Sequence, residues 1–224
     1  MGKGRSRCRP EAALLTVSPI PALVEQMLAD GLLRCPDCLG LLAPWGYAWR
    51  RKVRQLSGGF EELRLRRTIC PARGDRGCGR THVLLPAFLL ARRWDMAELI
   101  WAALRARADG WGWRRQVALV GRAVSTVRGW VARAVVRAVP ILGHFVQAEH
   151  VLVSAAGAAM ARVAPTGTRW GDAVAQVGVV LAALRRCGRV APVHEAVSVV
   201  SGGWLLGTRT LRPLLPGSNI SAHL

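Results

Sequence analysis

The stretch that decides the fold of this chain begins with LRCPDCLGLLAPWGYAWRRKVRQL at residues 33–56 and ends with LRLRRTICPARGDRGCGRTHVLLP at residues 63–86. It holds two pairs of cysteines: Cys35 and Cys38, then Cys70 and Cys78. The first pair lies in a tight CPDC turn, which brings two thiolates to one point, as half of a tetrahedral zinc site requires. The second pair would supply the other half, so we expect a metal site here.

The segment between the two pairs has the pattern of a β-hairpin. Two runs with strand character, residues 45–56 and 61–69, are separated by Ser57-Gly58-Gly59, a sequence typical of a tight turn. Turn, hairpin and turn in this order predict a zinc ribbon over residues 32–90. A segment with so few apolar residues needs a metal to fold, so we expect structural Zn²⁺ in a closed site with no open position for a substrate.

The fourth ligand is left open by the spacing. Seven residues separate Cys70 from Cys78 where a ribbon usually has two, so the loop between them is loose. His82, in the sequence CGRTH, is the reserve ligand if Cys70 lies too far away, although ligand chemistry favours Cys70. The alternative to a metal site is a set of reduced, packed cysteines. Cys8 and Cys187 have no partner at ligand spacing and are predicted to be free thiols.

The next segment, residues 91–140, is predicted to form a small all-helical unit. Asp95 is a suitable N-cap for a first helix, which has apolar residues at the spacing of one helical face and ends near residues 109–110. A second helix is expected from Trp113 to Val120, stopping at Gly121. A third helix is expected to be capped by Ser125 or Thr126, with inward positions at Val127, Trp130, Val131 and Ala134, and the helical unit is expected to end at Pro140.

Three helices with a glycine turn before the last are typical of a helix-turn-helix, whose third helix enters the major groove of DNA. Arg128 is the best candidate for reading a base, because its guanidinium matches the two acceptors of guanine. The remaining candidates for contacts with bases or phosphates are Ser125, Thr126, Arg133, Arg122, Arg114 and Arg115. The alternative is a generic three-helix bundle whose arginines only keep the surface soluble.

Composition and charge agree with a nucleic-acid partner. The 224 residues are 51% hydrophobic and carry 32 Lys and Arg against 13 Asp and Glu, a net charge of +19. Of this excess, +8 falls in residues 1–80, +7 in residues 81–140 and +4 in residues 141–224. We expect the protein to bind double-stranded DNA, with an affinity that falls as salt rises. Charge alone does not distinguish DNA from RNA as the partner. A high arginine content can also reflect the codon bias of a GC-rich genome.

The two ends of the chain carry less information. Residues 1–31 are expected to form a basic arm and one short helix, and residues 141–224 an Ala- and Val-rich helical region with a frayed tail. The apolar runs fall short of the ~18–20 residues that span a membrane. We therefore predict a mainly α fold with a small β ribbon, in a reducing cytoplasm and associated with the nucleoid.

The ribbon stretch resembles the zinc-ribbon head of bacterial insertion-sequence transposases, and RRQVALVGRAVSTVRGWVAR at 114–133 is similar to the helix-turn-helix that follows it. Together they resemble a family of bacterial proteins with this head and no transposase body. The resemblance covers residues 30–137 and implies that the four cysteines are metal ligands and that Val127 and Trp130 belong to the third-helix core. Val117 stands where the family usually has a small alanine, which implies looser packing there.

Other functions remain as alternatives. A transposase or recombinase needs carboxylates that hold metal ions, and after residue 140 the only acids are Glu149, Asp172 and Glu195. We therefore expect no enzyme and no small-molecule substrate, with a truncated or intact transposase as the rival interpretation. A third interpretation is a helical protein-interaction module with Trp170 and Trp204 as anchors. A homodimer would fit DNA binding too, because two-fold proteins bind paired half-sites.

Overall fold

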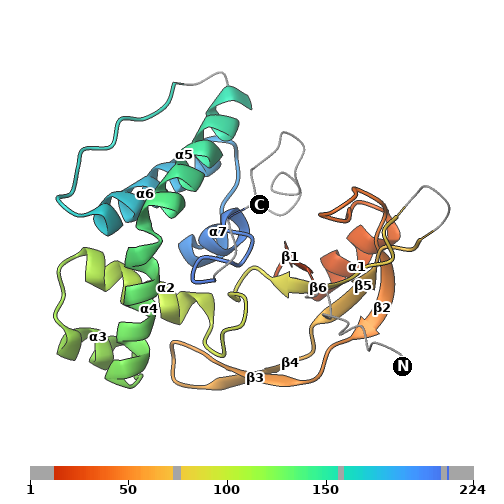
Figure 1. Cartoon of the computed structure of the whole chain (residues 1–224), viewed down its shortest axis with the longest axis horizontal. Coiled ribbons are helices and arrows are strands. Elements are labelled where there is room, and N and C mark those ends of the chain that lie inside the picture. Colours follow the sequence, from red (N-terminus) through yellow and green to blue (C-terminus); the bar gives the residue numbers. More distant parts are fainter. Residues whose placement is uncertain (1–12, 73–76, 156–158, 208–210, 212–224) are drawn as a thin grey trace, which may run out of the picture.

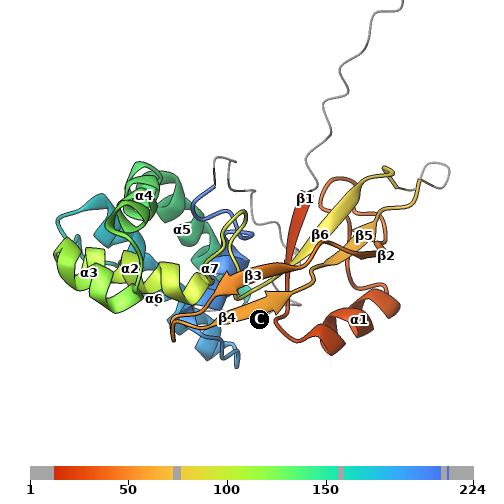
Figure 2. The same ribbon diagram turned by 90° about the horizontal axis from the view of Figure 1, so that it is seen from below.

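The computed structural model describes residues 13–72, 77–155, 159–207 and 211. These residues form an α-rich molecule with a small β part, which has seven helices and six strands. Figure 1 shows the strands and helix α1 on one side and helices α2 to α7 on the other, and Figure 2 shows the same division from below. The basic residues 1–12 and the tail from residue 212 lie outside the described residues, and so does Cys8.

The β part is organised around a four-stranded sheet with the order β1-β6-β5-β2. Its strands are β1 (Ala13–Val17), β2 (Ala43–Tyr47), β5 (Arg66–Ile69) and β6 (Thr81–Pro86). β1 pairs with β6 in parallel, and the other pairs are antiparallel. Helix α1 (Pro21–Ala29) packs through Val24, Met27 and Leu28 on a core that includes two of the cysteines.

Strand β1 was not predicted from the sequence. Residues 13–17 read ALLTV, a run too short to show a period, and their partner strand lies some seventy residues further along the chain. The short helix expected in residues 1–31 is present as α1. The part of residues 1–31 that the structure describes therefore completes the sheet and does not stand apart as an arm.

The predicted hairpin turn is present, but the strands around it are divided. β3 (Arg51–Arg54) and β4 (Phe60–Leu63) form a separate two-stranded sheet. Gly58 in the turn has φ 90°, a backbone conformation that favours glycine. Figures 1 and 2 show this hairpin reaching from the sheet towards the helical side.

Three helices follow the sheet: α2 (Ala97–Ala108), α3 (Trp113–Val120) and α4 (Val124–Val136). The helix predicted at 113–120 and its stop at Gly121, which has φ 57°, are confirmed. The two predicted caps are wrong. Met96 and Ala123 occupy the N-cap positions of α2 and α4, and neither makes a side-chain cap bond. The side chain of Asp95 instead forms an ion pair with Arg122.

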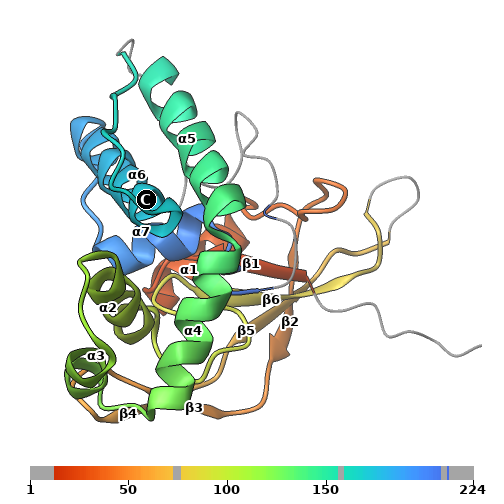
Figure 3. The same ribbon diagram turned by 60° about the vertical axis from the view of Figure 1, so that its left-hand side comes forward.

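The hydrophobic core of the helical side continues across residue 140, where the sequence predicted the end of the small helical unit. Pro140 lies in the first turn of α5 (Ala138–Ala155), where proline is tolerated because its missing N–H would have no helical partner. Ile141 and Phe145 of α5 join one cluster with residues of α2 and α4. Helices α6 (Arg169–Arg186) and α7 (Val193–Val200) complete it, and Figure 3 shows α5 running on from α4.

Hydrogen bonds join the last helix and the residues after it to the segment that follows β6. Ser198 Oγ donates to the Leu89 carbonyl at 2.6 Å, and the Ala91 amide donates to the Gly203 carbonyl at 2.8 Å. Gly203 has φ 77°, and a Cβ there would come within 2.5 Å of Leu85. The end of the described chain is therefore packed tightly against the β part.

Length and hydropathy single out no described helix as able to cross a membrane by itself. The pair α4 and α5 passes the same test when taken together, with a bend of 64° between its two helices.

Candidate metal centre and nucleic-acid interface

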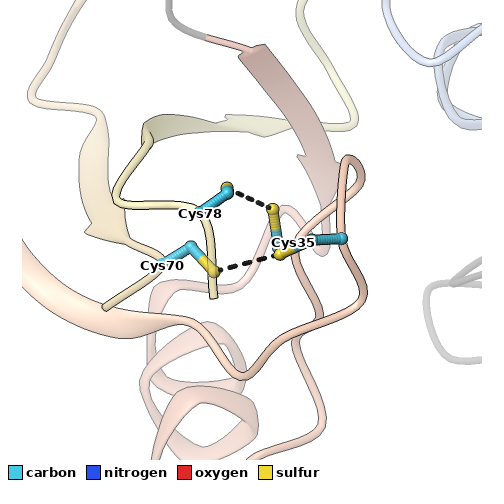
Figure 4. A group of neighbouring side chains, drawn as sticks. Cys35, Cys70 and Cys78 are labelled. Carbon is cyan, nitrogen blue, oxygen red and sulfur yellow. Dashed lines mark hydrogen bonds between the residues drawn. The ribbon is translucent and has the colours of Figure 1, made fainter. Parts of the chain in front are cut away.

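The four predicted cysteine ligands converge at one point, as Figure 4 shows for Cys35, Cys70 and Cys78. Cys35 Sγ lies 3.6 Å from Cys78 Sγ, and Cys38 Sγ lies 3.4 Å from Cys70 Sγ. In a tetrahedral site with Zn–S bonds of about 2.3 Å, sulfur atoms lie roughly 3.8 Å apart. All four sulfurs lie within 4.8 Å of one another, so they could hold a metal ion.

The backbone around the first pair is shaped to present its sulfurs. The Cys35 amide donates to the Gly40 carbonyl at 2.8 Å, and the Leu39 amide donates to the Cys35 carbonyl at 2.9 Å. Leu39 has φ 61°, a left-handed conformation rare for leucine. The Asp37 amide points at Cys35 Sγ from 3.4 Å, and such N–H groups stabilise a thiolate.

Two glycines that shape the site were not predicted from the sequence. A Cβ on Gly77, which has φ 102°, would lie 1.9 Å from the Pro71 carbonyl oxygen. A Cβ on Gly40 would come within 3.0 Å of Cys70 Sγ. Gly77 has no room for a Cβ because its own loop folds back on Pro71, and the space at Gly40 is tight because the two cysteine loops approach each other there. The sequence CLG after the first pair was the available signal for Gly40.

Burial makes negative charge costly at two of the four thiols. Cys35 and Cys70 are fully buried, whereas Cys38 and Cys78 reach the surface. Burial raises the pKa of Cys35 to about 12 and also raises the pKa of Cys70. The hydrogen bond from the Gly40 backbone lowers the pKa of Cys38. A cation among the four sulfurs would supply the positive charge that the two buried thiolates lack.

His82, the reserve ligand, does not take the place of Cys70. It is fully buried, and its Nε2 lies 3.4 Å from Cys35 Sγ. The second candidate ligand group contains Cys35, Asp37 and His82, so it shares only Cys35 with the four cysteines. His82 thus lies beside the cysteine site, where it contacts one sulfur.

Helix α4 presents the predicted contact residues on its outer side. Val127 and Trp130 are buried at 0% and 3% exposure, while Ser125, Arg128 and Arg133 are exposed and Thr126 is half-buried. Arg133 donates to the Gly129 carbonyl at 2.9 Å, within its own helix. Ser125 and Arg128 are therefore accessible near the start of α4.

Two of the predicted contact arginines stack on tryptophan rings. Arg128 Cζ lies 5.3 Å from the ring centre of Trp113, and Arg115 Cζ lies 4.1 Å from that of Trp111. Arg114, at the start of α3, is exposed. Stacking on a ring orients a guanidinium without using its N–H donors, which stay available to an acceptor.

Arg122 has a partner within the protein. Its Nε lies 3.0 Å from Asp95 Oδ1, and the Asp95 side chain is only 7% exposed. Burial raises the pKa of Asp95, and the nearby Arg122, Arg54 and Arg93 oppose that shift. The ion pair joins the segment before α2 to the turn between α3 and α4.

Two of the three acids after residue 140 accept hydrogen bonds from neighbouring groups of the protein. Glu149 accepts hydrogen bonds from Gln176 at 2.7 Å and from the Ala161 amide at 2.6 Å. Asp172 accepts from Thr166 at 2.7 Å, and Glu195 is half-buried on α7. Neither candidate metal-ligand group found among the described residues contains any of the three.

The tryptophans considered as partner anchors differ in exposure. Trp170 is buried at 4% exposure, and its Nε1 donates to the Leu104 carbonyl at 2.9 Å. Trp204 is half-buried and lies under Arg92, whose Cζ is 5.8 Å from the ring centre. Trp170 therefore belongs to the core.

Comparison with known proteins adds no further assignment: no protein-family model, curated protein or solved structure matches this chain.

Proposed function

We propose that this protein is a DNA-binding protein without a catalytic centre, in which structural Zn²⁺ bound by Cys35, Cys38, Cys70 and Cys78 holds the β part together. Helices α3 and α4 would act as a helix-turn-helix, with α4 in the major groove. The resemblance to the head of insertion-sequence transposases supports a regulator or a protein associated with a mobile element.

One observation carries this proposal: the two sides of α4 differ sharply. Val127 and Trp130 are buried against α2, while Ser125 and Arg128 face outward. Gly121, in the left-handed conformation, sets the short turn that leads into α4. A helix whose first turns are exposed, with an oriented arginine among them, has what reading a major groove requires.

The ligand chemistry supports zinc in particular. Four sulfur ligands in a tetrahedral group favour Zn²⁺ or an iron–sulfur cluster over magnesium or calcium. Four protein ligands leave no position for a water or a substrate, so the ion would be structural. Bound metal measured per chain, with and without chelator, tests this part by itself.

Selection from a random duplex pool, with the zinc-loaded protein, tests DNA binding. We expect the wild type to enrich one sequence, and Arg128→Ala to lose its preference at one base pair, worth about 1–3 kcal/mol. Arg186→Ala, at the exposed end of α6, is the matched control and should enrich the same sequence as the wild type. Equal, featureless enrichment by the wild type and Arg128→Ala would refute the proposal.

A further inference from the structure

The β3–β4 hairpin carries an exposed face that the proposed function leaves unused. Arg54 and Phe60 lie directly opposite each other across the two strands, and Arg54 Cζ is 4.6 Å from the centre of the Phe60 ring. Lys52 lies two residues before Arg54, so it belongs to the same face of the strand. Lys52 is exposed, and Phe60 is 61% exposed. We call Lys52, Arg54 and Phe60 the hairpin face.

The other side of the hairpin fixes it to the protein. Val53 is fully buried and packs in a cluster with Leu65, Leu89 and Met96. The Arg54 amide donates to the Trp94 carbonyl at 2.8 Å, and the Met96 amide donates to the Arg54 carbonyl at 2.9 Å. Strand β3 is therefore anchored on both of its long edges, and the exposed ring of Phe60 sits on β4, which pairs with it.

The hairpin face adjoins the turn that precedes α4. Arg54 pairs with Asp95 in a parallel bridge, which places their side chains on the same side, and Asp95 forms the ion pair with Arg122 of that turn. A ligand held by the start of α4 would thus have the hairpin face next to it.

The charge of the hairpin favours a polyanion. Residues 50–64 carry five Lys and Arg and two Glu. Glu62 forms an ion pair with Arg50 at 3.0 Å, and Glu61 accepts a hydrogen bond from Gln55 at 3.2 Å. Glu62 lies directly opposite Lys52 on the same face, so this face carries one acid, which Arg50 neutralises, beside Lys52 and Arg54. A single ring between two cations is typical of surfaces that contact nucleic acids and is too small an apolar area to anchor a protein partner.

From these contacts we infer that the hairpin face is a second DNA contact, which meets the backbone and the minor groove beside the major-groove site of α4. Lys52 and Arg54 would bind phosphate oxygens, and Phe60 would pack on sugars or wedge into the minor groove. This inference rests on the proposed function, because it places both elements on one duplex.

The test compares four zinc-loaded full-length proteins on the duplex obtained by selection: the wild type, the double variant Lys52→Gln/Phe60→Thr, Arg128→Ala and the control Arg185→Gln. The control removes an exposed charge at the end of α6, which Figure 1 places away from the hairpin. Zinc content and unfolding midpoint show that each variant is folded. Affinity is measured across a range of salt, and contacts are mapped by hydroxyl-radical footprinting.

We expect the double variant to bind about tenfold more weakly than the wild type, with a salt slope smaller by about 1, as the loss of one phosphate contact predicts. It should lose the protected sugars that flank the selected site and keep the base preference of the wild type. Arg128→Ala should do the reverse, and Arg185→Gln should match the wild type.

Three results would overturn the inference. A double variant with the slope and footprint of the wild type would refute the hairpin contact and leave the proposed function standing. A preference of the wild type for single-stranded DNA that the double variant loses would show that the face stacks unpaired bases and does not bind a duplex. A wild type that binds no duplex at all would refute both proposals.

Discussion

At the scale of single residues, the cysteine site depends on all four ligands, because they come from two separate loops that must be held together. Cys35 and Cys38 lie before β2, and Cys70 and Cys78 lie between β5 and β6. Two of the sulfurs are buried among apolar side chains of the core on which α1 packs, where Leu33 and Leu84 are also found. Losing one ligand would leave a buried neighbour with no partner for its charge.

We expect Cys70→Ser to lower bound zinc well below one per chain and to abolish the cooperative unfolding of the β part. Structural zinc contributes about 10 kcal/mol or more in small zinc domains, so the loss should be large. Metal analysis and thermal unfolding measure the two effects. Cys187→Ser is the matched control, because Cys187 is exposed and lies outside the cluster. Equal zinc content in the two variants would contradict the assignment of Cys70.

The pair of Asp95 and Arg122 gives the second prediction at this scale. Arg122→Ala leaves the carboxylate of Asp95 buried without its nearest cation. Breaking a buried pair costs about 3–5 kcal/mol, and because the Arg122 side chain is 28% exposed, we expect about 2–3 kcal/mol here.

The variants Asp95→Asn and Asp95→Asn/Arg122→Ala complete a double-mutant cycle, measured by urea unfolding. The double variant should be more stable than the sum of the single losses predicts, because no unpaired charge remains buried. Strict additivity would show that the two side chains do not interact. Arg122 would then be free for the phosphate contact that the sequence suggested.

At the scale of elements, the turn between α3 and α4 depends on one backbone conformation. Gly121 ends α3 in the left-handed region, and its amide donates to the Val117 carbonyl at 2.9 Å. A Cβ at Gly121 would meet no atom within 4 Å. Any penalty for a side chain there comes from the backbone alone.

We expect Gly121→Ala to destabilise the protein by about 1 kcal/mol, because alanine disfavours the left-handed conformation. Gly178→Ala is the matched control: Gly178 is exposed inside α6, with no atom within 4 Å of the added Cβ. That change should stabilise by about 0.5–1 kcal/mol, since alanine is the better helix former. The denaturation midpoints of the two variants test this prediction: Gly121→Ala should lower the midpoint and Gly178→Ala should raise it. Two shifts of the same sign would contradict the prediction.

At the scale of the whole molecule, helices α5 to α7 are part of the structure that positions α4. Ala134 of α4 and Leu104 of α2 are fully buried in a cluster that also contains Phe145 of α5 and Val177 of α6. Trp170 reaches from α6 to the Leu104 carbonyl. The last third of the chain therefore supports the interface proposed for DNA.

We expect a chain ended at residue 140 to lose cooperative unfolding, because α2 and α4 would expose the surface now covered by α5 and α6. Phe145→Ala, a milder change in the full-length chain, should cost about 3–5 kcal/mol. Calorimetry of the shortened chain and urea unfolding of the variant measure these effects. A shortened chain with the sharp transition of the full protein would show that residues 1–140 fold without helices α5 to α7.

The sequence by itself determined the features that depend on neighbouring residues. These are the CPDC turn, the turn at Ser57-Gly58-Gly59, the helix at 113–120 with its glycine stop, and the buried stripe of α4. Each follows from backbone preference or helical spacing within a short window. The four cysteines could also be chosen as candidate metal ligands from the sequence, because few residue types bind zinc and these four are suitably spaced.

Only the tertiary structure decided what depends on distant residues. These features are the pairing of β1 with β6, the contact of His82 with Cys35 and the ion pair of Arg122 with Asp95. The continuation of one hydrophobic core on both sides of Pro140 is a further example. The five residues ALLTV show no periodicity that identifies a partner strand, and a charged side chain carries no local sign of its partner. These contacts form because burial brings together segments that are far apart in the chain, and no local pattern records that.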